Sequence, residues 1–413
     1  GGRKRRLFCA RDHFGARPFY YYYRPGRLFC FGSEQKALFQ LPEVPRRLNE
    51  TKVADYFVPI QEDTESTFFC DILRLPPAHT LIVSAEGFEK RRYWALDPER
   101  TIDLGSDREY ADAFRELFCE AVRCRIRESV PIGSMLSGGL DSGSIAAVAR
   151  DQLRERGSPP LHTLSAIFDE VRQCDEREYM QPIIDQGHIE PHFVHADRVS
   201  PLVDIDRLHW HQDEPFYAPN MFMHWALYRE AAANGVQILL DGLDGDTTVS
   251  HGVPYLYELF RRGRWIRMAR EIRGVCRVSN GSPVRVFWKR AVKPALPDWT
   301  RRVKRLALGR RDEPVVPLPT LRRDFIERVG LVERERTFLE HRSRPPRSAR
   351  EDHYHRLRSG MIPFVLEISN KAAAAFAIEP WYPFFDVRLA EFCLAAPSNQ
   401  KLKNGWTRHI KGN

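Results

Sequence analysis

Two patterns of apolar residues follow each other along the chain, and the change between them falls near residue 100. Up to that point, short apolar runs are separated by Pro and Gly, which is typical of β-strands joined by turns. We predict strands over residues 19–23, 28–31 and 80–83. Beyond it, apolar residues between 110 and 122 recur every three or four positions, with Ser106 and Asp107 as N-caps, which predicts an α-helix. We therefore expect one domain over residues 1–98 and a second over 99–413.

In the second part, apolar runs alternate with helical patterns. Strand candidates cover residues 131–136, 161–168, 191–195 and 236–240, and helix candidates cover 142–154 and 175–186. Strands that alternate with helices form parallel sheets that carry helices on both faces. The predicted fold class is therefore α/β, with a doubly wound parallel sheet that follows a β-rich domain. Ligands of such sheets bind at the carboxyl ends of the strands.

Length and composition restrict the class of protein. The chain has 413 residues, 43% of them hydrophobic and 29% charged, which fits a globular protein of about two to three domains and excludes a fibrous or disordered one. The longest run without a charged residue, 215–228, is shorter than the ~20 apolar residues of a membrane-spanning helix. The eight cysteines form no C-x-x-C pair, which argues against structural zinc and a disulfide scaffold. We expect reduced thiols, no membrane partner and a cytoplasmic protein.

The net charge of +9 is concentrated in one segment. Residues 255–350 hold 26 Lys and Arg against 10 Asp and Glu, so they carry +16 and the rest of the chain −7. We interpret this segment as a basic helical insertion in the second domain. If it binds a partner, we expect an acidic peptide or protein rather than nucleic acid, because no aromatic-rich RNA-binding motif is present. The prolines that divide it into short predicted helices and loops are Pro283, Pro294, Pro297, Pro314, Pro317, Pro319, Pro345 and Pro346.

A glycine-rich turn lies between the first strand of the second domain and the helix that follows. Free N–H groups and the helix dipole both favour an anion at such a helix start, and glycine lets the backbone close on a phosphate. Asp141 in this turn can hold Mg²⁺. It is not a Walker A loop, because no Gly-Lys-Ser/Thr follows. The phosphate site that the sequence predicts consists of Ser137, Gly138, Gly139, Leu140, Asp141 and Ser142.

In this setting the turn resembles the pyrophosphate loop of the PP-loop ATP pyrophosphatases, and residues 130–148 resemble asparagine synthetase. Further segments resemble the same family in the same order. They are Arg11-Asp12, Phe31-Gly32-Ser33-Glu34 and Leu75-Pro76-Pro77 in the first part, and Asp213-Glu214-Pro215, Gly242 with Gly245-Asp246, and 379–386 in the second. The resemblance implies a doubly wound PP-loop domain, preceded by the C-terminal part of an α+β, Ntn-type glutaminase domain.

The activity that the resemblance implies is that of an ATP-dependent, AMP-forming amide ligase. Such an enzyme adenylates a small-molecule or peptide carboxylate, releases pyrophosphate, and then forms an amide with ammonia or an amine. Its cofactors would be ATP and Mg²⁺. By position, residues 137–142 would hold the pyrophosphate. The other positions that the resemblance assigns to the nucleotide are Leu136, Ala166, Asp241 and Gly242, and those assigned to the metal are Asp141 and Asp246.

The chain departs from the family pattern at three places. The family's glutaminase nucleophile is an N-terminal Cys, whereas this chain begins with Gly1, and we interpret Cys9 as structural. The Glu expected in the AMP loop is Leu243, which has no proton chemistry. Residues 405–410 resemble the family's G-x-x-K-x-x-L turn, but the segment with the active-site Lys would lie beyond Asn413. We therefore assign no catalytic residue and expect a glutaminase domain without its nucleophile half.

Several functions remain compatible with these residues. The first is an amide ligase of the asparagine synthetase type, with an acyl substrate that the sequence does not define. The second is a macrolactam cyclase of the lasso-peptide type, or an enzyme similar to β-lactam synthetase, in which the substrate supplies its own amine. Leu243 and the loop at 244–252 favour this second reading. A non-catalytic binding homologue and an RNA-modifying PP-loop enzyme are the further alternatives.

Overall fold

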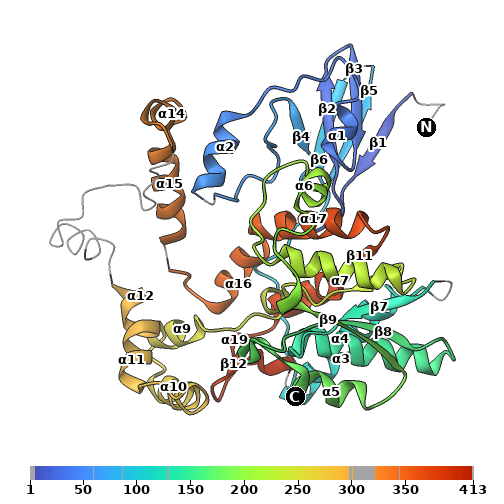
Figure 1. The fold of residues 1–413 in the computed structure, drawn as a ribbon. Coiled ribbons are helices and arrows are strands. Elements are labelled where there is room, and N and C mark those ends of the chain that lie inside the picture. Colours follow the sequence, from blue (N-terminus) through green and yellow to red (C-terminus); the bar gives the residue numbers. More distant parts are fainter. Residues whose placement is uncertain are drawn as a thin grey trace.

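The computed structural model describes residues 5–58, 60–85, 87–127, 130–296, 300, 321–343 and 345–411 (Figure 1). Four of the prolines predicted to divide the basic segment lie outside these residues, and so does Asn413. These prolines are Pro297, Pro314, Pro317 and Pro319. None of the described helices is long and apolar enough to cross a membrane. In Figure 1 the strands of the first part of the chain stand above a helix-covered sheet formed by the second.

Two antiparallel sheets of three strands pack face to face in the first region, which is residues 5–98. The four consecutive tyrosines of one central strand illustrate this packing, because neighbouring side chains of a strand point to opposite faces of the sheet. Tyr21 packs with Cys9 and Leu81 between the sheets, whereas Tyr20 and Tyr22 pack on the opposite face. The predicted strands of this region are confirmed to within a residue or two. The elements are β1 (Leu7–Ala10), β5 (His79–Ser84) and β6 (Gly87–Arg92) in one sheet, β3 (Leu28–Gly32), β2 (Tyr20–Arg24) and β4 (Ile72–Arg74) in the other, and helices α1 (Gln35–Leu38) and α2 (Glu50–Phe57).

The second part of the chain contains a five-stranded sheet in the order β11-β10-β7-β8-β9, in which all neighbours are parallel. The predicted α/β class and the parallel sheet are confirmed. Along the chain the first strand of the sheet, β7, lies beside the fourth, β10, so the strand order reverses between them. The carboxyl ends of strands on either side of such a reversal frame a crevice. The strands are β7 (Ile132–Met135), β8 (Leu161–Ile167), β9 (Ile189–His195), β10 (Ile238–Leu240) and β11 (Glu379–Trp381).

Helices cover both faces of this sheet (Figure 1). On one face, Phe118 and Ile145 pack against Leu161 of β8. On the other, Trp225 and its neighbours pack against Leu164 of the same strand. The helices of the first face are α3 (Asp107–Arg123), α4 (Leu140–Glu155), α5 (Arg177–Ile184) and α18 (Val387–Ala395), and those of the second are α6 (Ile205–Gln212), α7 (Met221–Ala233) and α17 (Met361–Ala374).

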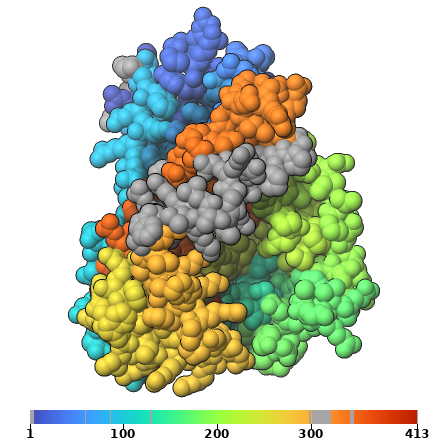
Figure 2. Space-filling view, turned by 90° about the vertical axis from the view of Figure 1, so that its left-hand side faces the viewer, coloured from blue at the N-terminus to red at the C-terminus, as the bar shows by residue number. Residues whose placement is uncertain are grey.

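The described residues of the basic segment are mainly helical, and its two halves pack in different places (Figure 1). One half packs as a small core around Leu256 and Ile272. The other half packs on the first region: Arg334 pairs with Asp55 of α2 at 2.6 Å, and Leu331 packs against Ala54. Figure 2 shows this second half, in orange, lying against the first region in blue. The helices are α9 (Tyr255–Arg261), α10 (Trp265–Ser279), α11 (Pro283–Phe287) and α12 (Lys293–Ala295) in the first half, and α14 (Arg323–Arg328) and α15 (Leu331–Ser343) in the second. The next helix, α16 (Ala349–Leu357), packs through Ala349 on the core of the first half.

Candidate functional site

The glycine-rich turn lies at the predicted edge of the sheet, between β7 and the start of α4 at Leu140. Gly138 has φ +73°, a left-handed conformation that residues with a Cβ rarely adopt. A Cβ there would also lie 2.9 Å from Cβ of Glu176 and 3.0 Å from its carbonyl oxygen. Gly139 is in an extended conformation as N-cap of α4, and the nearest atom to a Cβ there would be Oγ of Ser137 at 3.4 Å. The turn therefore requires glycine at Gly138 and leaves room beside Gly139.

Two serine hydroxyls close the turn into a compact loop. The N–H of Ser137 donates to Oγ of Ser142 at 3.1 Å, and the two Oγ atoms lie 3.0 Å apart. Oγ of Ser142 also lies 3.2 Å from the carbonyl oxygen of Gly139, to which it donates. Because the first N–H groups of a helix have no partner within it, the start of α4 can bind an anion. The arrangement of residues 137–142 is suited to a phosphate group.

The turn after β10 lies directly against this loop, since β7 and β10 are neighbours in the sheet. A Cβ on Gly242 would lie 2.9 Å from the backbone nitrogen of Ser142. Asp241 is buried, and its Oδ1 accepts the N–H of Leu243 at 2.9 Å. Burial raises the pKa of Asp241 above its ordinary value. The structure thus brings together the two segments that the sequence places 100 residues apart.

The two other positions expected near the nucleotide differ in what they can contribute. Leu136 is buried in the core of the α4 face, and its backbone N–H donates to the carbonyl oxygen of Leu164 at 3.0 Å. Its side chain therefore packs in this core, beneath the phosphate loop. Ala166, near the end of β8, packs at the margin of the core on the α7 face. Its small side chain leaves space at this edge of the sheet.

Asp141 and Asp246, the two residues expected to bind Mg²⁺, share one positively charged partner. Nη1 of Arg408 donates to both carboxylate oxygens of Asp141 at 3.2 Å and also pairs with Asp246. Nζ of Lys411 contacts Asp141 and lies 4.7 Å from the centre of the Phe384 ring. Carboxylates that share one cation can share another, and oxygen ligands of this kind suit Mg²⁺. The donor set therefore fits the metal, although Arg408 and Lys411 are the cations that face it here.

Arg408 and Lys411 were not among the site residues predicted from the sequence. They lie in a short hairpin and turn made of β12 (Leu402–Lys403), β13 (Trp406–Thr407) and the 3₁₀ turn His409–Lys411. The hairpin rests on α10: a Cβ on Gly274 would lie 2.3 Å from the carbonyl carbon of Asn404, and one on Gly405 would lie 2.0 Å from that of Gly274. Backbone contact between these glycines places Arg408 over the phosphate loop. Apart from the resemblance of residues 405–410, no sequence spacing indicated this.

Leu243, where the family has a glutamate, packs at the edge of an apolar cluster with Phe14, Ile362 and Tyr382. Phe14 belongs to the first region, so this cluster joins the two parts of the chain. A leucine side chain neither donates nor accepts a proton. The loop after β10 therefore contains no acid or base at this position.

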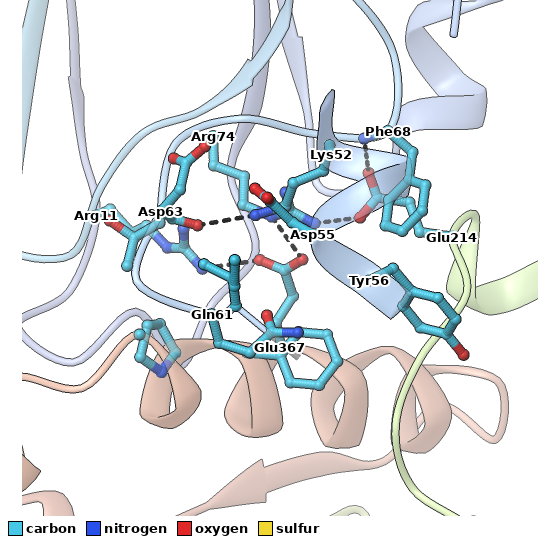
Figure 3. Close-up of a pocket in the computed structure, with 15 residues that line it drawn as sticks. Arg11, Lys52, Asp55, Tyr56, Gln61, Asp63, Phe68, Arg74, Glu214 and Glu367 are labelled. Carbon is cyan, nitrogen blue, oxygen red and sulfur yellow. Dashed lines mark hydrogen bonds and ion pairs between the residues drawn. The ribbon is translucent and has the colours of Figure 1, made fainter. Parts of the chain in front are cut away.

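A second group of charged residues lies between the two parts of the chain (Figure 3). Glu367 of α17 pairs with Arg11 and with Nε of Arg74, both at 3.0 Å, and Tyr20 donates to it. Burial alone would raise the pKa of Glu367, but Arg74, Arg11 and Lys371 lower it to about 2. The group is a buried network of ion pairs across the interface.

Asp213 and Glu214 belong to this interface rather than to the nucleotide edge. Glu214 pairs with Arg74 and accepts the N–H of Phe68 at 2.7 Å (Figure 3). Asp213 accepts the N–H of Gln35 at 2.8 Å. Both carboxylates therefore hold the first region against the sheet domain. The positions of Asp213 and Glu214 in the sequence could not show this, because their partners in the first region lie at least 140 residues away.

Comparisons with known proteins find a family match for each part of the chain. A family model described as asparagine synthase matches residues 113–411, and one described as a glutamine amidotransferase domain matches residues 1–94. The chain is 36% identical over 185 residues to asparagine synthetase [glutamine-hydrolyzing] 3 of Bacillus subtilis (strain 168), covering 45% of this chain and 30% of that protein. It is 28% identical over 242 residues to putative asparagine synthetase [glutamine-hydrolyzing] 2 of Methanocaldococcus jannaschii, covering 58% of this chain and 46% of that protein. It is also 28% identical over 252 residues to amidase chyE of Penicillium rubens, covering 58% of this chain and 37% of that protein.

The matched part of the chain spans less than half the length of these relatives. The asparagine synthase match nevertheless covers well over half of this chain, including both loops of the candidate site. The chain therefore belongs to the asparagine synthase family.

Proposed function

We propose that this chain uses ATP to activate a carboxylate as an acyl-adenylate, with release of pyrophosphate, and then forms an amide with ammonia or an amine. The observation that carries the proposal is the meeting of three segments at the reversal point of the sheet: the loop 137–142, the turn Asp241–Gly242 and Asp246. Pyrophosphate departs with negative charge, so its loss is favoured by fixed dipoles and cations aimed at it. Membership of the asparagine synthase family supports ATP as the nucleotide.

In this proposal the phosphates bind at the start of α4, against Gly139 and the hydroxyls of Ser137 and Ser142. Asp141 and Asp246 would hold Mg²⁺, which when bound neutralises phosphate charge and favours departure of pyrophosphate. Arg408 and Lys411 pair with these carboxylates and lie beside the same loop. We assign them the task of balancing the charge of the carboxylates and of pyrophosphate as it leaves.

The amine is the less defined substrate. Leu243 supplies no base to assist attack by ammonia, so the nucleophile would need to be an amine that is already reactive, or a base from elsewhere. This observation favours the second candidate function, a cyclase of the macrolactam or β-lactam type in which the substrate carries its own amine. The glutamine amidotransferase match over residues 1–94 favours ammonia from glutamine. We take the first region to be part of such an α+β, Ntn-type domain, with the boundary near residue 98 and the PP-loop domain after it.

The proposal is tested by ATP–pyrophosphate exchange with a panel of carboxylates, among them aspartate and carboxyl-terminated peptides. Exchange with at least one carboxylate is expected, and Asp246→Asn should abolish it. Asp112→Asn is the matched control, because Asp112 is exposed on α3, paired only weakly with Arg108 at 3.7 Å, and away from the site. If no carboxylate supports exchange, the chain is a binding homologue and the proposal is wrong.

Product analysis separates the two sources of the amine. With external ammonia, labelled nitrogen enters the product and turnover depends on the ammonia concentration. With an internal amine, the product is the substrate less one water, and added labelled ammonia is not incorporated. Incorporation of label would reject the cyclase.

A further inference from the structure

Two histidines and a glutamate meet on neighbouring strands at the far edge of the sheet. His162 is the second residue of β8, and Glu190 and His192 are the second and fourth of β9. The register pairs His162 with Glu190 and Leu164 with His192. Since neighbouring parallel strands present paired residues on the same face, all three side chains lie on the face that α7 covers. The sequence did not indicate this group, because His162 lies 30 residues before His192 and the three residues bear no familiar ligand spacing.

The ligand atoms of the three side chains are spaced as a metal site requires. Nδ1 of His162 lies 2.9 Å from Nε2 of His192 and 3.8 Å from Oε2 of Glu190, and Nε2 of His192 lies 3.9 Å from Oε1 of Glu190. A tetrahedral ion with bonds of about 2.0–2.1 Å holds its ligand atoms about 3.3 Å apart. The three observed distances lie on both sides of that value. Among the described residues, this is the one group of three or more His, Cys, Asp or Glu side chains whose ligand atoms all lie within 4.8 Å of one another.

The two imidazole rings lie edge to edge rather than face to face. Their planes differ by 19° and their centres are 5.2 Å apart, while the facing nitrogens are 2.9 Å apart. One neutral ring must therefore donate N–H to the other. Metals bind the neutral form of imidazole through a ring nitrogen that carries no proton. A small tilt of each ring would replace this shared proton with an ion.

Burial gives the site two fixed ligands and one accessible ligand. The side chains of His162 and His192 are 15% and 11% exposed, and that of Glu190 is 56% exposed. Both histidines are on strands held by a continuous ladder of hydrogen bonds, so their backbone positions are fixed. The exposed carboxylate can close on an ion that enters from solvent, and a water can take the fourth position.

We propose that His162, Glu190 and His192 bind a divalent transition-metal ion of the zinc type, independently of the nucleotide site. The two sites lie at opposite ends of the strands. The loops 137–142 and 241–242 follow the carboxyl ends of their strands, whereas this group lies towards the amino ends of β8 and β9. The site joins β9, an edge strand, to β8. Imidazole nitrogens favour ions such as Zn²⁺, Co²⁺ and Ni²⁺ over Mg²⁺, so excess Mg²⁺ does not compete.

The test uses untagged chain that has been stripped with a chelator and kept in excess Mg²⁺, which fills carboxylate sites. Equilibrium dialysis with Zn²⁺ should show one tightly held equivalent. Co²⁺ should give the intense visible absorption of a tetrahedral site, and Zn²⁺ should abolish it. No thiolate-to-cobalt band should appear, which excludes the exposed Cys124 and Cys174 as ligands.

The variants His162→Ala, His192→Ala and Glu190→Gln should each weaken binding by more than about 10-fold, since even the loss of an outer partner of a ligand costs about 10- to 100-fold. His209→Ala, which removes an exposed histidine on α6, is the control and should bind as the unaltered chain does. Glu190→Gln changes an exposed side chain, so it reports on binding even if the histidine variants fold poorly. No tightly held equivalent, or equal binding by Glu190→Gln, would overturn the proposal.

Discussion

Nη1 of Arg408 lies 3.2 Å from each carboxylate oxygen of Asp141, although 267 residues separate the two in the chain. The same guanidinium also pairs with Asp246. Its side chain is only 18% exposed, so solvent screens these contacts weakly. Removal of the cation would leave two carboxylates beside the loop that we assign to phosphate.

Arg408→Met should therefore raise KM for ATP by at least about 10-fold, because Lys411 alone then balances the two carboxylates and their remaining negative charge repels the phosphates. Unit charges near a protein surface interact by about 4 kcal/mol at 4 Å. Pyrophosphate exchange at varied ATP concentration measures this. Arg322→Met removes an exposed arginine from the basic segment and should leave KM unchanged. An unchanged KM in Arg408→Met would mean that Arg408 serves only to hold the hairpin in place.

Gly138→Ala should destabilise the chain, whereas Gly139→Ala should not. At Gly138 a methyl group meets Glu176 at 2.9 Å and the backbone is left-handed, which together cost about 1–3 kcal/mol. At Gly139 the backbone is extended and the nearest atom, Oγ of Ser137, is 3.4 Å away. Thermal unfolding of both variants provides the measurement. Equal midpoints would show that the loop is free to rearrange.

Glu367→Gln should lower the free energy of unfolding by about 3–5 kcal/mol, because it removes the negative charge that pairs with the buried Arg11 and Arg74. Urea denaturation measures the change. Glu391→Gln is the comparison: its pair with Arg100 is at the surface and should cost less than about 1 kcal/mol. A loss at Glu367 no larger than at Glu391 would show that water reaches the interface.

Lys401 and His353 form a fully buried pair whose stability contribution depends on pH. Nε2 of His353 donates to the carbonyl oxygen of Thr248 at 3.0 Å, so its Nδ1 accepts from Nζ of Lys401 at 2.9 Å. Burial lowers the pKa of Lys401 to about 7, from 10.5 when unfolded. Between these values the unfolded chain binds more protons than the folded one, so stability rises with pH.

From pH 7 to pH 9 this group alone should add about 2 kcal/mol to the free energy of unfolding. Urea denaturation at the two pH values measures the difference. Lys401→Met has no such group and should show a rise smaller by that amount. A rise of the same size in both chains would mean that Lys401 titrates normally in the folded state.

The strands and the phosphate loop were predictable because their signals are local. Apolar runs and turn residues mark β2 and β8, and Ser106 caps α3 as expected, since its Oγ accepts the N–H of Glu109 at 3.2 Å. Gly138 and Gly139 follow directly on a strand, so the loop was recognisable from one short stretch. These features depend on residues that are close in sequence.

What could not be predicted depends on contacts between distant segments. Arg408 reaches Asp141 only because a hairpin lies on α10, and Asp213 meets Gln35 only because the two parts of the chain pack together. Both halves of the basic segment hold more Lys and Arg than Asp and Glu, yet Leu331 packs on the first region and Leu256 does not. Charge and periodicity indicate that such residues are helical or exposed, but not which surface they contact.

The contact between Gly274 and Gly405 has a consequence for reading related sequences. Neither position can carry even a methyl group while this helix and hairpin touch, so only glycine is allowed at both positions. A relative that has glycine at both positions can place a basic residue over its phosphate loop in the same way. One that has a larger residue at either must hold that part of its chain elsewhere. Two glycines outside the predicted phosphate loop thus serve as a marker that separates relatives with this arrangement from those without it.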